Sequence, residues 1–172
     1  NYNTAMGYKS LYANTTGANN TAIGFEALLN NTTGSSNTAI GLQTLSANTT
    51  GFSNTAIGRS ALLSNTTGDN NIALGHDSLK SNTTGSNNVA LGFESGYSNT
   101  TGFGNVFIGY KAGYNETGSN KLYIANGTGN SNRLIYGDFS SGNMTIGNGS
   151  GTIDFSASTV NTGNLRVNGK KV

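Results

Sequence analysis

The chain has 172 residues, of which 9% are charged, and its formal net charge is +2. So few charges do not mark a nucleic-acid or anionic-lipid partner, and the absence of cysteine excludes disulfides and thiolate metal sites. Proline is also absent, which suits a backbone whose N–H groups enter long ladders, and no apolar stretch approaches the roughly 20 residues that span a bilayer.

The first predicted element is a repeat, marked by a glycine that returns every 17 residues. Over residues 20–34 its frame reads N-T-A-I-G-F-E-A-L-L-N-N-T-T-G, and the last copy, at 105–118, is one residue shorter. A fixed period of this length indicates a solenoid. We therefore predict a parallel β-roll of about seven 17-residue coils over residues 1–118, roughly 34 Å long at about 4.8 Å per coil. The repeating glycines, which are expected to turn the chain, are Gly7, Gly24, Gly41, Gly58, Gly75, Gly92 and Gly109.

Within each coil, the segment N-[TIV]-A-[IL] predicts a short strand, because β-branched residues favour a pleated surface. Neighbouring strand residues point to opposite faces, yet both Ala and Ile are apolar, so we expect burial on both faces. One face fills the narrow coil, and the other needs a cover that a cyclic homo-oligomer supplies. The asparagine that precedes each strand is expected to stack as an amide ladder: Asn20, Asn37, Asn54, Asn71, Asn88 and Asn105.

From residue 119 the repeat phase is lost, and short alternating segments predict strands at 121–125, 133–136, 143–146, 152–155 and 164–167. Just before this point the leucine of the earlier coils becomes glycine, at Gly96 and Gly113. A repeat array needs an atypical end, so we predict a C-terminal β cap and fibre neck over residues 119–172. Larger core residues are expected there, namely Tyr123, Tyr136, Phe139 and Phe155.

The motif N-x-A-[IL]-G, as in NNIALG at 70–75 and NNVALG at 87–92, resembles the repeat of trimeric autotransporter adhesin heads. Together with N-T-T-G it also resembles repeats of phage tail fibres and related bacterial surface fibres. SNKLYIAN at 119–126 and LIYGDF at 134–139 are similar to the segment that closes such arrays, and NLRVNGKKV at 164–172 to the fibre sequence before a self-cleaving chaperone.

This resemblance implies a homotrimer with three β-rolls around one axis, placed outside the cell on a virion tail fibre or a bacterial surface. Its implied partners are the other copies, the adjoining fibre segments and a host-surface glycan or protein, and its implied role is structural support of attachment. The chain opens at Asn1 in mid-repeat, so we expect it to be a piece of a longer protein.

Aromatic residues outside the predicted strands are the candidate receptor or glycan contacts, and aromatics are also suited to packing between subunits. We favour packing, because a trimer buries much of each roll. The candidates are Tyr8, Phe25, Phe52, Phe93, Phe103 and Tyr110.

The sequence shows no constellation typical of catalysis or metal binding. His76 is the only histidine, and its column varies as a surface loop position does. Asp77 and Glu94 fall one coil apart, within reach of one another, but a hydrolase would also need a cleft and supporting residues. We therefore expect no enzymatic activity, no cofactor and no metal.

The Asn-Thr-Thr-Gly corner allows two further interpretations. Asn-x-Thr is a glycosylation sequon, although turn chemistry explains it better because every copy lies at the same corner. Regular threonine rows on a flat solenoid face can bind ice, but adjacent threonines point to opposite faces of an extended chain. Ice or surface binding is therefore retained as the alternative function.

Overall fold

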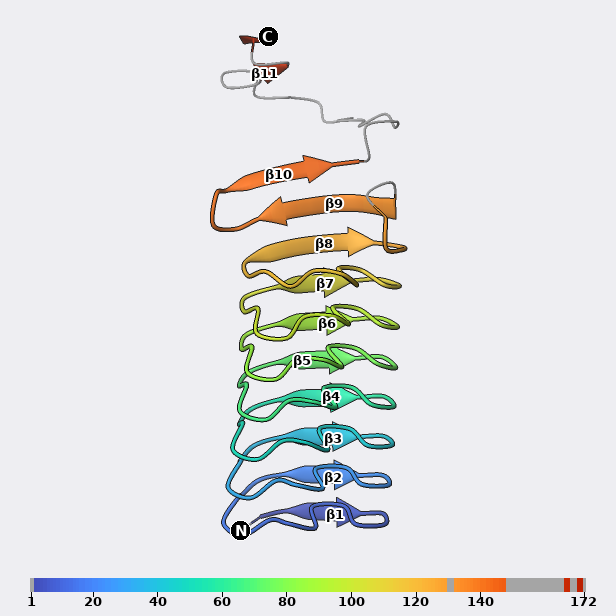
Figure 1. Cartoon of the computed structure of the whole chain (residues 1–172), viewed down its shortest axis with the longest axis vertical. Helices are drawn as coiled ribbons and strands as arrows, with labels where there is room; N and C mark the ends of the chain where they lie inside the picture. Colours follow the sequence, from blue (N-terminus) through green and yellow to red (C-terminus); the bar gives the residue numbers. More distant parts are fainter. Residues whose placement is uncertain (1, 130–131, 148–165, 168–169, 172) are drawn as a thin grey trace, which may run out of the picture.

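The computed structural model describes residues 2–129 and 132–147, together with the backbone of 166–167 and 170–171. The chain winds into a rod of stacked coils, with one short strand per coil along the same side (Figure 1). Successive strands are parallel and in register, so that Ala22 pairs with Ala39 and Ala39 with Ala56. The predicted β-solenoid of 17-residue coils is confirmed by its strands β1 (Thr4–Met6), β2 (Thr21–Ile23), β3 (Thr38–Ile40), β4 (Thr55–Ile57), β5 (Ile72–Leu74), β6 (Val89–Leu91) and β7 (Val106–Ile108).

Three longer strands continue the same sheet, which has ten strands in sequence order (Figure 1). β8 (Lys121–Ala125) is parallel to β7, whereas β9 (Arg133–Asp138) and β10 (Asn143–Ile146) are antiparallel. β8 and β10 match the predicted strands, and β9 is two residues longer than expected. A separate antiparallel pair joins β11 (Arg166–Val167) and β12 (Lys170–Lys171), while the strand expected at 152–155 lies outside the described residues.

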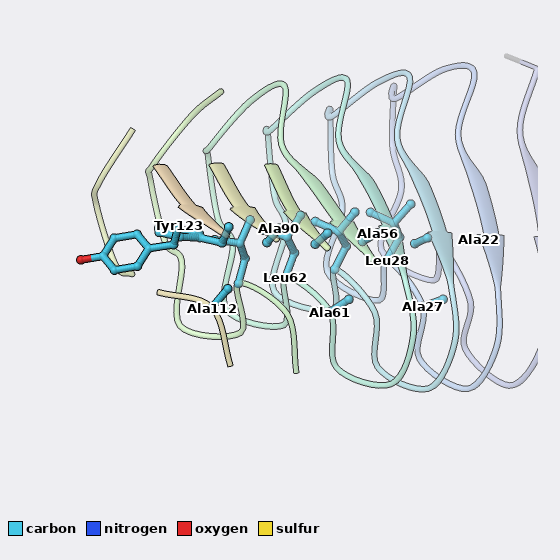
Figure 2. Packing of buried hydrophobic residues seen from close by; sticks show 14 of the residues in the cluster. Ala22, Ala27, Leu28, Ala56, Ala61, Leu62, Ala90, Ala112 and Tyr123 are labelled. Atoms are coloured by element: carbon cyan, nitrogen blue, oxygen red, sulfur yellow. The ribbon is translucent and has the colours of Figure 1, made fainter. Parts of the chain in front are cut away.

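The interior of the coil is narrow, and small or slender side chains fill it in columns along the rod (Figure 2). The central alanine of each strand from β2 to β6 is fully buried, and so is a column of leucines opposite it. These leucines adopt left-handed backbone angles, as at Leu28 with φ 51°. That conformation costs roughly 1–2 kcal/mol, and burying a leucine side chain returns roughly 1.5–3 kcal/mol, which makes the arrangement favourable. The column comprises Leu28, Leu45, Leu62 and Leu79.

The loss of leucine at Gly96 and Gly113 is explained by Phe107, which replaces alanine in β7 and is fully buried. A Cβ at Gly96 would lie 2.5 Å from Phe107 Cδ2, and one at Gly113 would lie 2.2 Å from Phe107 Cδ1. One phenyl ring therefore occupies the space of two leucines. Beyond it Tyr123 is buried as predicted, Tyr136 packs against the core, and Phe139 is exposed, so the expectation of a core role for Phe139 was wrong.

Two ladders of asparagines connect the coils. In the predicted ladder, Asn37 Oδ1 accepts from the backbone N–H of Asn54 at 3.0 Å, and Asn37 Nδ2 donates to the carbonyl of Gly51 at 2.8 Å. In a second ladder, Asn48 Nδ2 donates to Asn31 Oδ1 at 2.8 Å and to the same Gly51 carbonyl at 3.0 Å. A carbonyl oxygen can accept two hydrogen bonds, so the two ladders together fill both acceptor positions of the Gly51 carbonyl.

Candidate functional site: the outer sheet face, the aromatic columns and a polar pocket

The side of the sheet that points away from the coil interior forms an uncharged surface, which we call the outer sheet face. It consists of the residues on either side of the buried central position in each strand, because alternate residues share a face. Several are well exposed, such as Ile57 at 40% and Leu74 at 37%. Strand pairing aligns these residues in two columns. The first column consists of Thr4, Thr21, Thr38, Thr55, Ile72, Val89, Val106, Leu122, Gly137 and Met144. The second column consists of Met6, Ile23, Ile40, Ile57, Leu74, Leu91, Ile108, Ile124, Ile135 and Ile146.

The outer sheet face has a hollow where its first column loses a side chain, at Gly137 in β9. The hollow measures about 160 Å³, and its lining comprises Leu122, Gly137, Asp138, Phe139, Gly142, Asn143 and Met144. Asp138 is paired with Lys121. A Cβ at Gly137 would approach no atom closer than 3.3 Å, so the chain's own packing leaves nearly enough room for alanine. A glycine inside a strand often marks close approach by another group.

The predicted contact residues Tyr8, Phe25, Phe93 and Tyr110 form stacked columns along the rod. Tyr8 and Phe25 stack at 5.3 Å between ring centroids, and Phe93 and Tyr110 stack at 5.6 Å. His76 meets Phe93 edge-on at 5.3 Å. Stacking along the axis turns ring edges, rather than ring faces, toward solvent. The remaining two candidates lie apart from these rings in another column, three coils from one another, and all six are exposed: Tyr8, Phe25, Phe52, Phe93, Phe103 and Tyr110.

Charged residues lie beside these rings, and they pair with one another. Lys80 Nζ lies 3.0 Å from Asp77 Oδ2, and Lys111 Nζ lies 3.2 Å from Glu94 Oε2. The hydrogen bond that Lys111 donates to Glu94 raises the pKa of Lys111 above its ordinary value. Each of the two carboxylates is thus held by its own lysine. His76 Nε2 lies 3.6 Å from Asp77 Oδ1.

A second aromatic stack was not anticipated from the sequence. Tyr97 and Tyr114 stack at 4.9 Å, and Lys111 Nζ lies 5.4 Å from the centroid of Tyr114. The two tyrosines occupy one column, 17 residues apart, in which the earlier coils carry Tyr12, Leu29, Ser46, Leu63 and Lys80. Only the matching spacing could have indicated the stack.

A small polar pocket opens above Tyr114, where the seventh coil ends. It measures about 100 Å³ and is lined by Gly113, Tyr114, Asn115, Glu116, Tyr123, Gly127, Thr128 and Arg133. The hydroxyl of Tyr123 donates to Glu116 Oε2 at 2.6 Å, and the other carboxylate oxygen accepts from the N–H groups of Thr117 and Gly118. The Arg133 guanidinium lies 4.8 Å from the ring centroids of both Tyr123 and Tyr136.

The Tyr123–Glu116 hydrogen bond makes the stability of this region sensitive to alkaline pH. Burial, and then the hydrogen bond and charge of Glu116, raise the pKa of Tyr123 well above its ordinary value of 10.0. The unfolded chain therefore loses this proton first, so the stabilisation is complete below about pH 10 and is lost as pH rises toward the folded-state pKa. We expect the free energy of unfolding to fall above pH 10 in the wild type and less steeply in Tyr123→Phe, as measured by denaturant titration at each pH. Parallel slopes in the two proteins would contradict this.

The structure also shows which residues of the Asn-Thr-Thr-Gly corner are buried and which are exposed. From the second coil onward the asparagines of the sequons are buried, including Asn31, Asn48 and Asn65. The first threonine of a pair donates to the carbonyl of the next coil, as Thr32 Oγ1 does to Thr49 at 3.1 Å, and the second is exposed. Ice binding stays a prediction, which thermal hysteresis of the purified protein tests.

No family model, curated protein or solved structure matches this chain. Within the described part of the chain, no group of three or more His, Cys, Asp or Glu side chains is arranged to hold a metal ion. The same residues include no helix long and apolar enough to cross a membrane.

Proposed function

We propose that this chain is a rod segment of a homotrimeric extracellular fibre, of the adhesin or phage tail-fibre kind, which supports attachment to a host or surface. Its role is mechanical and not catalytic. The observation that carries the proposal is the outer sheet face, which is uncharged along all ten strands, roughly 43 Å at about 4.8 Å per strand. Extended uncharged aliphatic faces usually mark interaction surfaces.

The partner that fits this face best is another copy of the same face. In a threefold ring, residues that face the symmetry axis meet their own copies there, and three uncharged faces turned toward the axis meet without burying an unpaired charge. The hollow at Gly137 gives the interface a place for an inserted side chain. The number three follows from the resemblance of the N-x-A-[IL]-G repeat to trimeric fibres.

The remaining features suit a stiff spacer. Parallel pairing and two asparagine ladders connect each coil to the next, so bending the rod would break hydrogen bonds at several corners together. We assign residues 119–172 the role of cap and neck, since β9 and β10 reverse direction and end the coil pattern. The exposed aromatic columns are assigned to packing against neighbouring copies or to contacts with a host-surface glycan or protein.

A charge placed on the outer sheet face should dissociate the assembly. Leu74→Glu puts a carboxylate in the middle of the face, and burying three such charges against one another costs several kcal/mol each. We expect the variant to sediment as single chains at a concentration where the wild type is trimeric, with unchanged β-structure by circular dichroism. Thr67→Glu is the control, because Thr67 is exposed and lies at the Asn-Thr-Thr-Gly corner, outside both this face and the aromatic columns. Retention of the assembly in Leu74→Glu would show that this face is not the interface.

A further inference from the structure

The polar pocket arises from the shortened seventh coil. In the sixth coil Asn99 is fully buried in the second asparagine ladder, whereas Asn115, at the same place in the Asn-x-Thr-Gly motif, is exposed. The last hydrogen bond between asparagines of this ladder runs from Asn82 to Asn65. Asn99 donates only to the Gly102 carbonyl, and the Oδ1 atoms of Asn82 and Asn99 have no hydrogen-bond partner among the described residues. With no further coil above, the chain leaves this corner open, and residues after β8 form the opposite wall of the pocket.

The polar groups of the pocket are held in place before any ligand arrives. Three hydrogen bonds fix the Glu116 carboxylate, and a carboxylate can accept about four, so one acceptor position remains. The Arg133 guanidinium lies against both Tyr123 and Tyr136, 4.8 Å from each ring centroid, and its N–H groups make no hydrogen bond with the described residues. Thr128 adds an exposed hydroxyl to the lining. The site thus offers an acceptor, a planar donor and a hydroxyl, with charges that cancel.

An aromatic surface completes the site. Tyr97 covers one face of the Tyr114 ring, and the pocket's remaining residues come from Tyr114's own coil or from later in the chain, which places the pocket on the side of Tyr114 away from Tyr97. An aromatic face beside fixed polar groups suits a ligand with one apolar face and a rim of hydroxyls, because the apolar side packs on the ring and the hydroxyls pair with the polar groups.

We propose that this pocket binds one neutral pyranose ring, such as the terminal sugar of a surface glycan. A pyranose presents axial C–H groups on its face and hydroxyls around its edge, and its lack of charge matches the balance of Glu116 and Arg133. This inference rests on the proposed role in attachment, for which it names the class of partner. It places recognition at the end of the coil array, and not along the ring edges of the Tyr8–Phe25 and Phe93–Tyr110 columns.

The test uses the whole chain and four probes, the methyl pyranosides of glucose, galactose, mannose and N-acetylglucosamine. Binding is measured by chemical-shift titration of the protein's amides. We expect at least one probe to bind with shifts centred on residues 113–128, and Arg133→Gln and Thr128→Val each to weaken it by at least about tenfold. Arg59→Gln and Thr67→Val are matched controls on exposed coil positions and should leave binding unchanged.

Two results would overturn the inference: no binding of any of the four probes, or binding that Arg133→Gln and Thr128→Val leave unchanged. Thr128→Val keeps the test valid if Arg133→Gln disturbs the packing of Tyr123, since Thr128 is exposed. The mass of the same samples separates this site from the fibre role. A trimer without sugar binding removes the pocket's role alone, whereas a sugar-binding monomer removes the trimeric fibre.

Discussion

Replacing Gly75 by alanine should destabilise the rod by at least about 4 kcal/mol, beyond the usual range of single substitutions. Gly75 has φ +136°, and an added Cβ would lie 2.4 Å from the carbonyl oxygen of Gly92 in the next coil. That backbone region is almost restricted to glycine, and the clashing atom belongs to backbone, so relief requires two coils to separate. Denaturant unfolding followed by circular dichroism measures the loss.

Alanine substitutions at two other glycines separate the effect of the steric clash from the effect of the backbone angle. Gly51→Ala introduces clashes with Asn48 Oδ1 at 2.5 Å and with the Gly68 carbonyl oxygen at 2.6 Å, at a backbone angle that other residues adopt. Gly142→Ala meets nothing within 4 Å but has φ +72°, so it should cost only about 1 kcal/mol of backbone strain. We expect Gly75→Ala to be the most harmful of the three. A loss no larger than that of Gly142→Ala would show that the spacing between coils is not what fixes this glycine.

Phe107→Ala should lower the free energy of unfolding by about 3–5 kcal/mol, the usual cost of removing a buried phenyl ring. Phe107 is fully buried, and its ring fills the space beside Gly96 and Gly113. Restoring leucine at both glycines should recover much of the loss, because the triple variant then carries the alanine and leucine pattern of coils two to five. Both glycines have φ +61°, close to the angles of the leucines in those coils.

The direction in which Gly96→Leu changes the free energy of unfolding, compared between the wild type and Phe107→Ala, tests this exchange more directly. Gly96→Leu alone should destabilise the wild type, since even its Cβ would lie 2.5 Å from the Phe107 ring. The same change should stabilise Phe107→Ala by filling the cavity, which is strong non-additivity between contacting residues. Equal effects of Gly96→Leu in the two backgrounds would contradict the exchange of two leucines for one phenyl ring.

The coil architecture could be predicted from the sequence because a strict period places identical residues above one another. The asparagine ladder at Asn37 and Asn54 and the turn at Gly75 follow from that stacking alone. The link between Phe107, Gly96 and Gly113 could not, although each departure from the repeat is visible, because it depends on which columns face each other across the interior.

The polar pocket was also beyond prediction from the sequence. It follows from one missing residue in the seventh coil and from the path of the chain after β8, which brings Arg133 beside Tyr123. The second asparagine ladder could not be predicted for another reason. The same Asn-x-Thr pattern occurs in a buried ladder and in an exposed glycosylation sequon, and only the burial of Asn48 and its hydrogen bond to Asn31 distinguish the two.

The mass of the purified chain in solution, measured by sedimentation equilibrium, tests the trimeric rod most directly. We expect three times the 17.6 kDa of one chain, with the outer sheet face of each copy covered by its neighbours. A well-folded protein that sediments as a single chain throughout the accessible concentration range would contradict the proposal.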